Sequence, residues 1–312
     1  MGSVGATARV TRASSWHSAA LRKEAIQGFL CIAPWLIGFL AFTAGPMIAS
    51  LWLSATDYEI LRPIHFIGLG NFGRALRDPL FGKSLWNTAF YTGLYVPLHL
   101  LTALLAAMLL NTNVHGKGIY RVIFYVPSLM PAVANVFLWM WIFNPEYGLA
   151  NAALDVIGLP PQKWLYSYTL AKPSFVIMGI WGLGSAMLIF LAGLQGIDPV
   201  LYEASSIDGA SAWTKFWRIT LPMLTPTLFF NLTMGIIGSF QVFTSAYIAT
   251  AGGPNNATLF YVLYIYWQGW QYTRMGYAAA LAWVLFAIVL LVTMIQFRVA
   301  GRWVYYEVER SG

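Results

Sequence analysis

The chain has 312 residues, of which 59% are hydrophobic and 9% charged, and its formal net charge is +7. Because a soluble domain has about a quarter of its residues charged, this composition excludes an ordinary soluble protein and indicates a membrane protein. The positive charge is assigned to loop residues beside membrane lipid, not to binding of nucleic acid. The single cysteine, Cys31, excludes an internal disulfide bond.

Six apolar stretches are long enough to cross a bilayer. A helix needs about 20 residues to span the hydrocarbon core, where the backbone must satisfy its own hydrogen bonds. Segments such as LLTALLAAMLL lack the alternation of a membrane β-strand. We therefore predict an all-α polytopic membrane protein with six transmembrane helices, at 26–50, 89–110, 119–143, 175–194, 224–248 and 277–297.

The N-terminal segment is basic and precedes an apolar run that is too long for a signal peptide, so we predict an uncleaved first helix. Six spans place both termini on one side, and the segments on that side hold more Lys and Arg than those on the other. The positive-inside rule therefore predicts that both termini are cytoplasmic. The predicted parts are an N-terminal segment (1–25), a transmembrane domain (26–298) and a C-terminal tail (299–312).

The loop between the fourth and fifth predicted spans differs from the others because it is polar and carries helix signals. Asp198 is a favourable N-cap and Pro199 suits the first helical position, so we predict a short helix that ends near Ile207. Asp208-Gly209 is a turn pair, and Ser211 can cap a second short helix.

In the second short helix, Trp213, Phe216 and Trp217 are spaced to share one face, and Pro222 is predicted to end it. Two short helices joined by a tight turn would form a projecting knob. Small side chains beside Glu203 suit docking into a groove of another protein. An amphipathic segment that rests on lipid headgroups is the alternative.

The same loop carries a recognisable order of residues. Glu203, Ala204 and Ser205, then Gly209, then Ile219, Leu221 and Pro222, resemble the EAA loop of the permeases of binding-protein-dependent ABC importers, with Ser205 in place of the second alanine. The fragments APWLIGFLAFTAGPMIASLW, GLGNF with WNT after it, YRVIFYVPSLMPAVANVFLWMWIF, and TAGGPNNAT followed by MGYAAALAW resemble the sugar-permease branch, of the maltose, lactose and glycerol-phosphate type.

This resemblance implies an ABC type I importer permease fold in the bacterial plasma (inner) membrane. It implies four partners: a second homologous permease, two copies of a cytoplasmic ATPase, and an extracytoplasmic sugar-binding protein. ATP and Mg would bind to the ATPase, and this chain would bind no cofactor or metal and have no catalytic residue. The implied ATPase-coupling loop is 196–222, with Glu203, Ala204, Ser205, Asp208, Gly209, Ile219, Leu221 and Pro222 as its contact residues.

Two further features of the sequence agree with a transport subunit that is not itself an enzyme. Gly82-Lys83-Ser84 is not a Walker A loop, because Arg77 stands where the first glycine is required. The predicted spans contain essentially no Asp, Glu or Lys, which argues against a proton-coupled or ion-coupled carrier. His99 is the nearest candidate, and we interpret it as a neutral histidine packed between helices.

A sugar site requires hydroxyl or amide side chains beside aromatic ones. The resemblance places the sugar contacts on the spans before and after the coupling loop. Hydrogen bonding or packing between helices is the alternative role for such side chains. Asn135 and Trp139, one turn apart, are also able to line the path. The implied substrate-binding residues are Trp181, Gly182, Ser185, Ser239, Phe240 and Gln241.

The function that we expect is transport of a di- or oligosaccharide by the permease subunit of an ATP-driven importer. The first alternative is an importer permease for another solute, such as glycerol phosphate or an amino acid. A polytopic membrane enzyme is the second alternative, and it would need clustered Asp, Glu or His side chains. Asp57 and Glu59 form the closest acidic pair, but nothing basic or metal-binding accompanies them.

Overall fold

The computed structural model describes residues 19–60, 62–112 and 115–305. The chain divides into two compact units, at residues 1–53 and 54–312. Most of the predicted N-terminal segment and the end of the predicted tail lie outside the described residues, so these predictions stay untested.

The first unit is one apolar helical run that bends through a π-helical turn. It consists of α1 (Ala19–Phe39), η2 (Leu40–Ala44) and α2 (Gly45–Ser54). The Gly45 N–H donates to the carbonyl of Leu40, and a Cβ atom at Gly45 would lie 3.0 Å from that oxygen. Pro46 follows and has no N–H to donate, so the irregular turn occurs where the regular hydrogen-bond ladder is interrupted. The stretch Arg22–Ser54 is long and apolar enough to cross a membrane.

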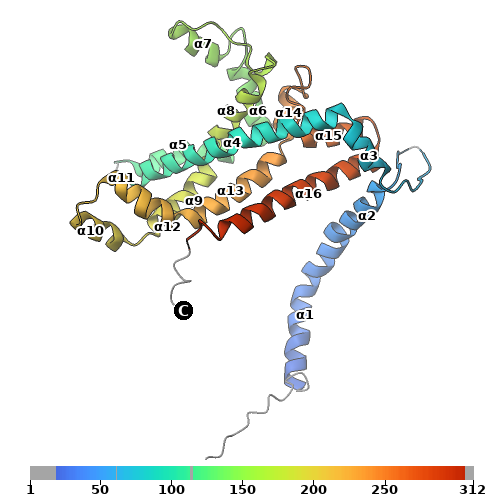
Figure 1. Ribbon diagram of the computed structural model, residues 1–312, viewed down its shortest axis with the longest axis horizontal. Coiled ribbons are helices and arrows are strands. Elements are labelled where there is room, and N and C mark those ends of the chain that lie inside the picture. Colours follow the sequence, from blue (N-terminus) through green and yellow to red (C-terminus); the bar gives the residue numbers. More distant parts are fainter. Residues whose placement is uncertain (1–18, 61, 113–114, 306–312) are drawn as a thin grey trace, which may run out of the picture. The chain divides into compact units, whose positions relative to one another are not determined.

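The second unit contains the other helices (Figure 1). Four of them are short or irregular pieces of the polar loop, and the remainder are membrane-length helices, halves of bent helices, or short helices of the connecting loops. They are α3 (Gly70–Arg77), α4 (Pro79–Asn111), α5 (Lys117–Leu129), α6 (Ala132–Ile142), α7 (Leu149–Val156), η3 (Trp164–Tyr166), α8 (Ala171–Trp181), α9 (Gly184–Gln195), α10 (Pro199–Ile207), α11 (Ala212–Lys215), η4 (Phe216–Thr220), α12 (Leu221–Met223), α13 (Thr225–Phe240), α14 (Thr244–Ala249), α15 (Tyr261–Tyr266), η5 (Trp267–Gln271) and α16 (Met275–Ala300).

Helix α4 is the central element of this unit. It packs against α8, α9 and α13, and Figure 1 shows it running alongside α9 and α13. Asp78 caps it by accepting from the Leu80 amide, and Pro79 occupies the first turn. Residues 79–88, which precede the predicted span at 89–110, are therefore the first turns of α4. The helix that contains the predicted second span, 89–110, is therefore longer than the apolar stretch from which the span was predicted.

The predicted third and fourth spans are bent pairs of helices. α5 and α6 meet at 101°, and α8 and α9 meet at 50°. Between α5 and α6, Met130 is extended with ψ 136° because the residue before Pro131 is disfavoured in the helical region. The predicted third span, 119–143, is therefore a broken span made of two helices. Within the described residues, four helical runs are long and apolar enough to span a membrane, or up to six if each bent pair is one span.

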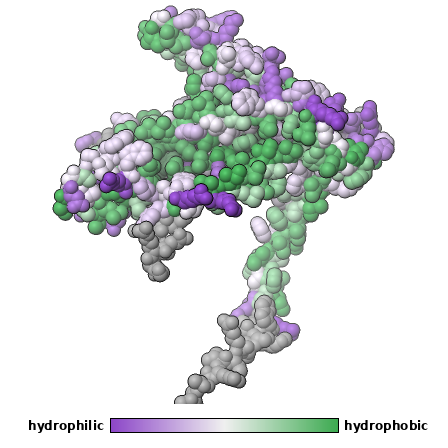
Figure 2. Space-filling view, in the orientation of Figure 1, coloured by the Kyte–Doolittle hydropathy of each residue, from purple (hydrophilic) through white to green (hydrophobic). Residues whose placement is uncertain are grey.

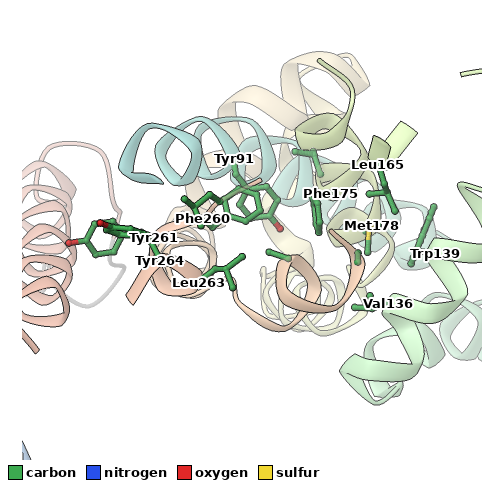
Figure 3. Packing of buried hydrophobic residues seen from close by; sticks show 14 of the residues in the cluster. Tyr91, Val136, Trp139, Leu165, Phe175, Met178, Phe260, Tyr261, Leu263 and Tyr264 are labelled. Carbon is green, nitrogen blue, oxygen red and sulfur yellow. The ribbon is translucent and has the colours of Figure 1, made fainter. Parts of the chain in front are cut away.

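Two buried clusters hold the second unit together. The aromatic cluster includes Tyr91, Phe175 and Phe260, which Figure 3 shows side by side, with Tyr261 and Tyr264 beyond them. The aliphatic cluster joins α4, α9 and the start of α13 through residues that include Leu100, Ala103, Ala107, Met187, Leu191 and Leu224. Figure 2 shows hydrophobic residues over the middle of the long helices and hydrophilic ones gathered near α7 and near the helix ends.

The loop between α14 and α15 is seated on α4. Asn87 donates from its amide nitrogen to the carbonyls of Asn256 and Leu259, at 2.9 and 3.1 Å. The Thr88 hydroxyl accepts from the Tyr261 amide at 2.9 Å. These buried polar contacts fix the start of α15 against α4, and they bring Phe260 to the aromatic cluster.

Candidate functional site

The polar loop contains the first predicted short helix. Asp198 caps α10 by accepting from the Val200 amide at 2.9 Å, and the helix ends at Ile207. Gly209 has φ +73°, a left-handed conformation that glycine adopts without steric penalty. Ser211 accepts from the Thr214 amide at 3.2 Å at the start of α11. The predicted caps and the turn between them are confirmed.

The second short helix does not end at Pro222, and that prediction is wrong. α11 continues through the π-helical turn η4 into α12, which contains Pro222, and α13 follows at Thr225. The Leu221 N–H donates to the Phe216 carbonyl, the wider π spacing. A helix tolerates proline within its first turn or where the hydrogen-bond ladder is already shifted, and both conditions apply here.

Contacts between side chains connect the two short helices. Lys215 Nζ donates to Ser206 Oγ at 2.6 Å, and the hydroxyls of Tyr202 and Thr220 lie 2.9 Å apart. The predicted shared face of aromatic residues is present, since the Trp213 and Trp217 rings are 5.5 Å apart at 71°. The loop is therefore a folded unit with internal ties, and it lies at one end of the long helices (Figure 1).

The predicted coupling residues divide into two groups by exposure. Glu203, Ala204, Asp208 and Gly209 are exposed, and Ser205 is half-buried with its hydroxyl donated to the Tyr202 carbonyl. Ile219 packs against the aliphatic cluster, and Leu221 and Pro222 are half-buried. The first group therefore lies on the exposed surface of the loop, whereas the second fixes the loop to the bundle.

A cavity with a volume of about 540 Å³ lies between α4, α9 and α13. We call it the serine cavity because Ser185 and Ser239, two of the predicted substrate residues, both line it. Five other polar or aromatic residues were not predicted to line it as a group. They are Tyr91, Tyr95, His99, Phe230 and Asn231.

The three unpredicted residues on α4 are recognisable in the sequence by their spacing. Tyr91, Tyr95 and His99 are spaced so that each lies one turn after the last, on one side of the helix. Their rings follow one another, at 5.2 Å from Tyr91 to Tyr95 and 5.0 Å from Tyr95 to His99. This row forms an aromatic wall of the cavity.

The other predicted substrate residues do not line this cavity. Trp181 packs edge-on against Trp139 with ring centroids 5.6 Å apart, and Gly182 lies at the break between α8 and α9. Phe240 is buried, and Gln241 is exposed at the end of α13. The structure therefore brings together Ser185 and Ser239, and leaves these four apart from them.

A second, smaller cavity of about 250 Å³ is also lined by Tyr91. We call it the asparagine cavity because Asn135 lines it, together with Phe175 and Gly179 of α8 and the hydroxyls of Thr244 and Ser245. The Asn135 amide oxygen is buried and has no hydrogen-bond partner in the part of the chain that the structure describes. Asn135 was recognised from the sequence as a residue able to line the path.

The chemistry of both cavities is uncharged. Their lining side chains, all from the described part of the chain, are hydroxyl, amide, imidazole, aromatic and aliphatic groups without Lys, Arg, Asp or Glu. Among the described residues, no three His, Cys, Asp or Glu side chains come together in a group that could hold a metal ion. The arrangement suits binding of a neutral, hydroxyl-bearing molecule.

Comparisons with known proteins agree with these observations. Residues 99–305 match the family described as binding-protein-dependent transport system inner membrane component. The probable ABC transporter permease protein YesP of Bacillus subtilis (strain 168) is 43% identical over 295 residues, which cover 93% of this chain and 95% of YesP.

Two further proteins extend the likeness. The arabinooligosaccharides transport system permease protein AraP of the same bacterium is 34% identical over 304 residues, or 96% of each chain. A chain in the crystal structure of a bacterial ABC transporter involved in the import of the acidic polysaccharide alginate has a TM-score of 0.77 and 26% identity, covering 91% of this chain and 99% of that one.

Proposed function

Because the chain belongs to the family of binding-protein-dependent transport system inner membrane components, we propose that it is the permease subunit of an ATP-driven importer for a sugar, as a di- or oligosaccharide. The observation that carries the sugar assignment is the serine cavity. Its row of tyrosines and its hydroxyl and amide groups offer an apolar face and hydrogen bonds together, as a sugar ring requires. The oligosaccharide named for AraP supports the same class.

The partners that we propose follow from the exposed part of the coupling loop. Glu203 and Ala204 on α10 would dock on one of two cytoplasmic ATPase copies, which hold ATP and Mg, and the chain itself would hydrolyse no ATP. A second homologous permease would complete the pathway, and an extracytoplasmic binding protein would deliver the sugar. In this arrangement the loop and both termini face the cytoplasm.

The mechanism depends on the side-chain hydrogen bonds between the short helices of the loop. Lys215 with Ser206, and Tyr202 with Thr220, hold α10 against the helical run that leads into α13. A displacement of α10 by closing ATPases is therefore transmitted to α13, which lines the serine cavity. The loaded binding protein docks outside, the permeases turn outward as ATP closes the ATPases, sugar enters, and hydrolysis returns the pair to the inward state.

A charged solute is a weaker candidate for the serine cavity. Glycerol phosphate or an amino acid brings one or more ionised groups, and burial of a charge requires a partner of opposite charge. The lining residues supply none. An amino-acid or phosphate substrate would therefore have to be paired by the second permease.

The test is the ATPase activity of the complex that co-purifies with this chain, in lipid nanodiscs with its binding protein. The panel contains arabinose, arabinobiose, arabinotriose, glucose, maltose, maltotriose and lactose, with glycerol phosphate and amino acids as the non-sugar set. We expect stimulation by one sugar series only. Stimulation by the non-sugar set alone, with the complex intact, would reject the sugar assignment.

A further inference from the structure

The serine cavity and the asparagine cavity share one wall, and that wall is Tyr91. We propose that the asparagine cavity is a second sugar subsite, so that adjacent rings of one oligosaccharide lie on either side of Tyr91. The inference rests on the proposed function and deepens it, because it assigns a place for each ring and makes chain length, not only ring identity, a property that this subunit recognises.

The position of Tyr91 is fixed by its neighbours. Its ring stacks on Tyr95 at 5.2 Å with an interplanar angle of 4°, and it lies 5.3 Å from the Phe260 ring. Figure 3 shows Tyr91 and Phe175 close to Phe260, whose ring centroid lies 5.6 Å from that of Phe175. A Cβ atom on Gly179 would lie 3.0 Å from the Tyr91 hydroxyl and 2.6 Å from the Tyr95 ring. The two tyrosines therefore reach α8 only because residue 179 has no side chain.

This arrangement makes the aromatic surface continuous between the cavities. Tyr95 and His99 extend it along the serine cavity, whereas Phe175 extends it along the asparagine cavity. Aromatic faces bind the C–H faces of sugar rings without requiring one fixed hydroxyl pattern. A continuous surface accordingly suits a ligand longer than either cavity.

Each of the two cavities has a lining residue with an unsatisfied polar atom. In the described part of the chain, His99 Nδ1 beside the serine cavity has no hydrogen-bond partner, and neither has Asn135 Oδ1 in the asparagine cavity. Trp139 Nε1, one turn along α6 from Asn135, is also unpaired although only 9% of this residue is exposed. Buried polar groups are normally paired, because an unpaired one is costly.

A hydroxyl-bearing ligand satisfies such atoms on both sides. A hydroxyl group both donates and accepts, so it can donate to the amide oxygen of Asn135 and can pair with either tautomer of His99. Thr244 and Ser245, whose hydroxyl groups can both donate and accept, also line the asparagine cavity. The chemistry that the two cavities have in common is therefore that of a neutral polyol.

The volumes of the two cavities favour one ligand that occupies both over two ligands that bind independently. Complete small-molecule sites have volumes of about 300–1,000 Å³. The asparagine cavity, at about 250 Å³, is smaller than this range, whereas the serine cavity, at about 540 Å³, lies within it. The smaller cavity suits one end of a ligand that is anchored in the larger cavity. A monosaccharide would then occupy the serine cavity alone.

The experiment uses cysteine protection in the assembled transporter. Cys31 is the only cysteine of this chain, so Cys31→Ser gives a background in which one new cysteine can be followed. Ser185→Cys reports on the serine cavity and Asn135→Cys on the asparagine cavity. Phe137→Cys is the matched control, because Phe137 is an exposed residue of α6 that lines neither cavity. N-ethylmaleimide is the label, and the sugar series that stimulates the ATPase is the competitor.

We expect the monosaccharide to slow labelling of Ser185→Cys at least threefold and to leave Asn135→Cys unchanged. The disaccharide and trisaccharide should slow both, and no sugar should affect Phe137→Cys. Protection of Ser185→Cys alone by every chain length would overturn the second subsite and leave the proposed function intact. The same holds if Asn135→Cys is unreactive in the sugar-free complex while Ser185→Cys reacts, since another group then fills the cavity.

A second measurement tests the same inference if one of the cysteine variants assembles poorly. Asn135→Leu in the otherwise native chain should raise the KM for uptake of the trisaccharide about tenfold and leave the KM for the monosaccharide unchanged. An equal change for both lengths contradicts the inference. If no sugar stimulates the ATPase at all, the proposed function fails, and the inference fails with it.

Discussion

The Asp78 carboxylate accepts a hydrogen bond of 3.0 Å from the hydroxyl of Tyr277, a residue 199 positions later in the chain. The same oxygen accepts from the Tyr264 hydroxyl, and the other carboxylate oxygen caps α4 through the Leu80 amide. One side chain therefore connects the start of α4 to α15 and α16. The Arg74 guanidinium lies 4.7 Å from the centre of the Tyr277 ring and adds a cation–π contact.

Removal of the Tyr277 hydroxyl should destabilise this junction. Tyr277→Phe loses a hydrogen bond to a charged acceptor, worth about 1.5–3 kcal/mol. Tyr261→Phe is the control, because the Tyr261 hydroxyl donates to a neutral acceptor, the Leu281 carbonyl, and its loss should cost only about 0.5–1.5 kcal/mol. The measurement is the thermal unfolding of both variants in nanodiscs. A lower Tm for Tyr261→Phe than for Tyr277→Phe would contradict the charged network.

The Asp78 network also predicts a dependence of stability on pH. Burial raises the pKa of Asp78, but hydrogen bonds from Tyr264, the Leu80 amide and Tyr277 outweigh it and hold the pKa below the ordinary value of 3.8. Because the pKa of Asp78 is lower in the folded state than in the unfolded state, its carboxylate contributes fully to folding stability above the ordinary pKa. That contribution is lost as the pH falls through the folded-state pKa. The difference in Tm between the native chain and Asp78→Asn should therefore be constant from about pH 7 to 5 and shrink below about pH 4. A difference that is independent of pH down to about 3 is incompatible with this assignment.

Reversal of charge on the exposed face of α10 should uncouple the transporter. Glu203→Lys is expected to leave membrane insertion unchanged, to abolish sugar uptake, and to weaken ATPase association by about 2 kcal/mol or more. Asp155→Lys is the control, because Asp155 is an exposed acidic residue on α7, outside the coupling loop. Co-purification of the ATPase with each variant gives the readout. Undiminished uptake by Glu203→Lys would argue against the proposed coupling role.

The turn between α10 and α11 should tolerate asparagine better than alanine at position 209. A Cβ atom at Gly209 meets nothing within 4 Å, so the penalty arises only from φ +73°. For alanine this costs about 1 kcal/mol, whereas asparagine enters the left-handed region more readily. We expect Gly209→Ala to lower the sugar-stimulated ATPase rate about fivefold and Gly209→Asn to lower it less. Equal effects of the two variants would indicate a contact made by the glycine and not a backbone requirement.

A side chain at position 179 should disturb the tyrosines that separate the two cavities. The Cβ of Gly179→Ala would overlap the Tyr95 ring and contact the Tyr91 hydroxyl, and overpacking of this kind costs about 1–3 kcal/mol. We expect a lower Tm and a raised KM for uptake. Gly93→Ala is the control, since a Cβ atom at that position of α4 has nothing within 4 Å. Native-like uptake and Tm for Gly179→Ala would show that the rings move aside without consequence.

The sequence by itself determined the membrane class, the helical architecture and the caps of the coupling loop. Composition and the length of the apolar stretches suffice for the membrane class and the helical architecture, because a segment in lipid must satisfy its backbone hydrogen bonds within itself. Asp198 and Ser211 accept hydrogen bonds from amides in the first turn of the helix that each one caps, and Gly209 adopts a positive φ. The caps and the turn therefore depend only on residues that are close in sequence.

Other features were decided by tertiary structure. Pro131 explains the break between α5 and α6, but the angle of 101° between them depends on what each half packs against. Ser185 and Ser239 meet Tyr91, Tyr95 and His99 only because α9 and α13 both pack on α4. Contacts between residues far apart in the chain depend on which helix faces are buried together, and the periodicity of a uniformly apolar helix does not specify those faces.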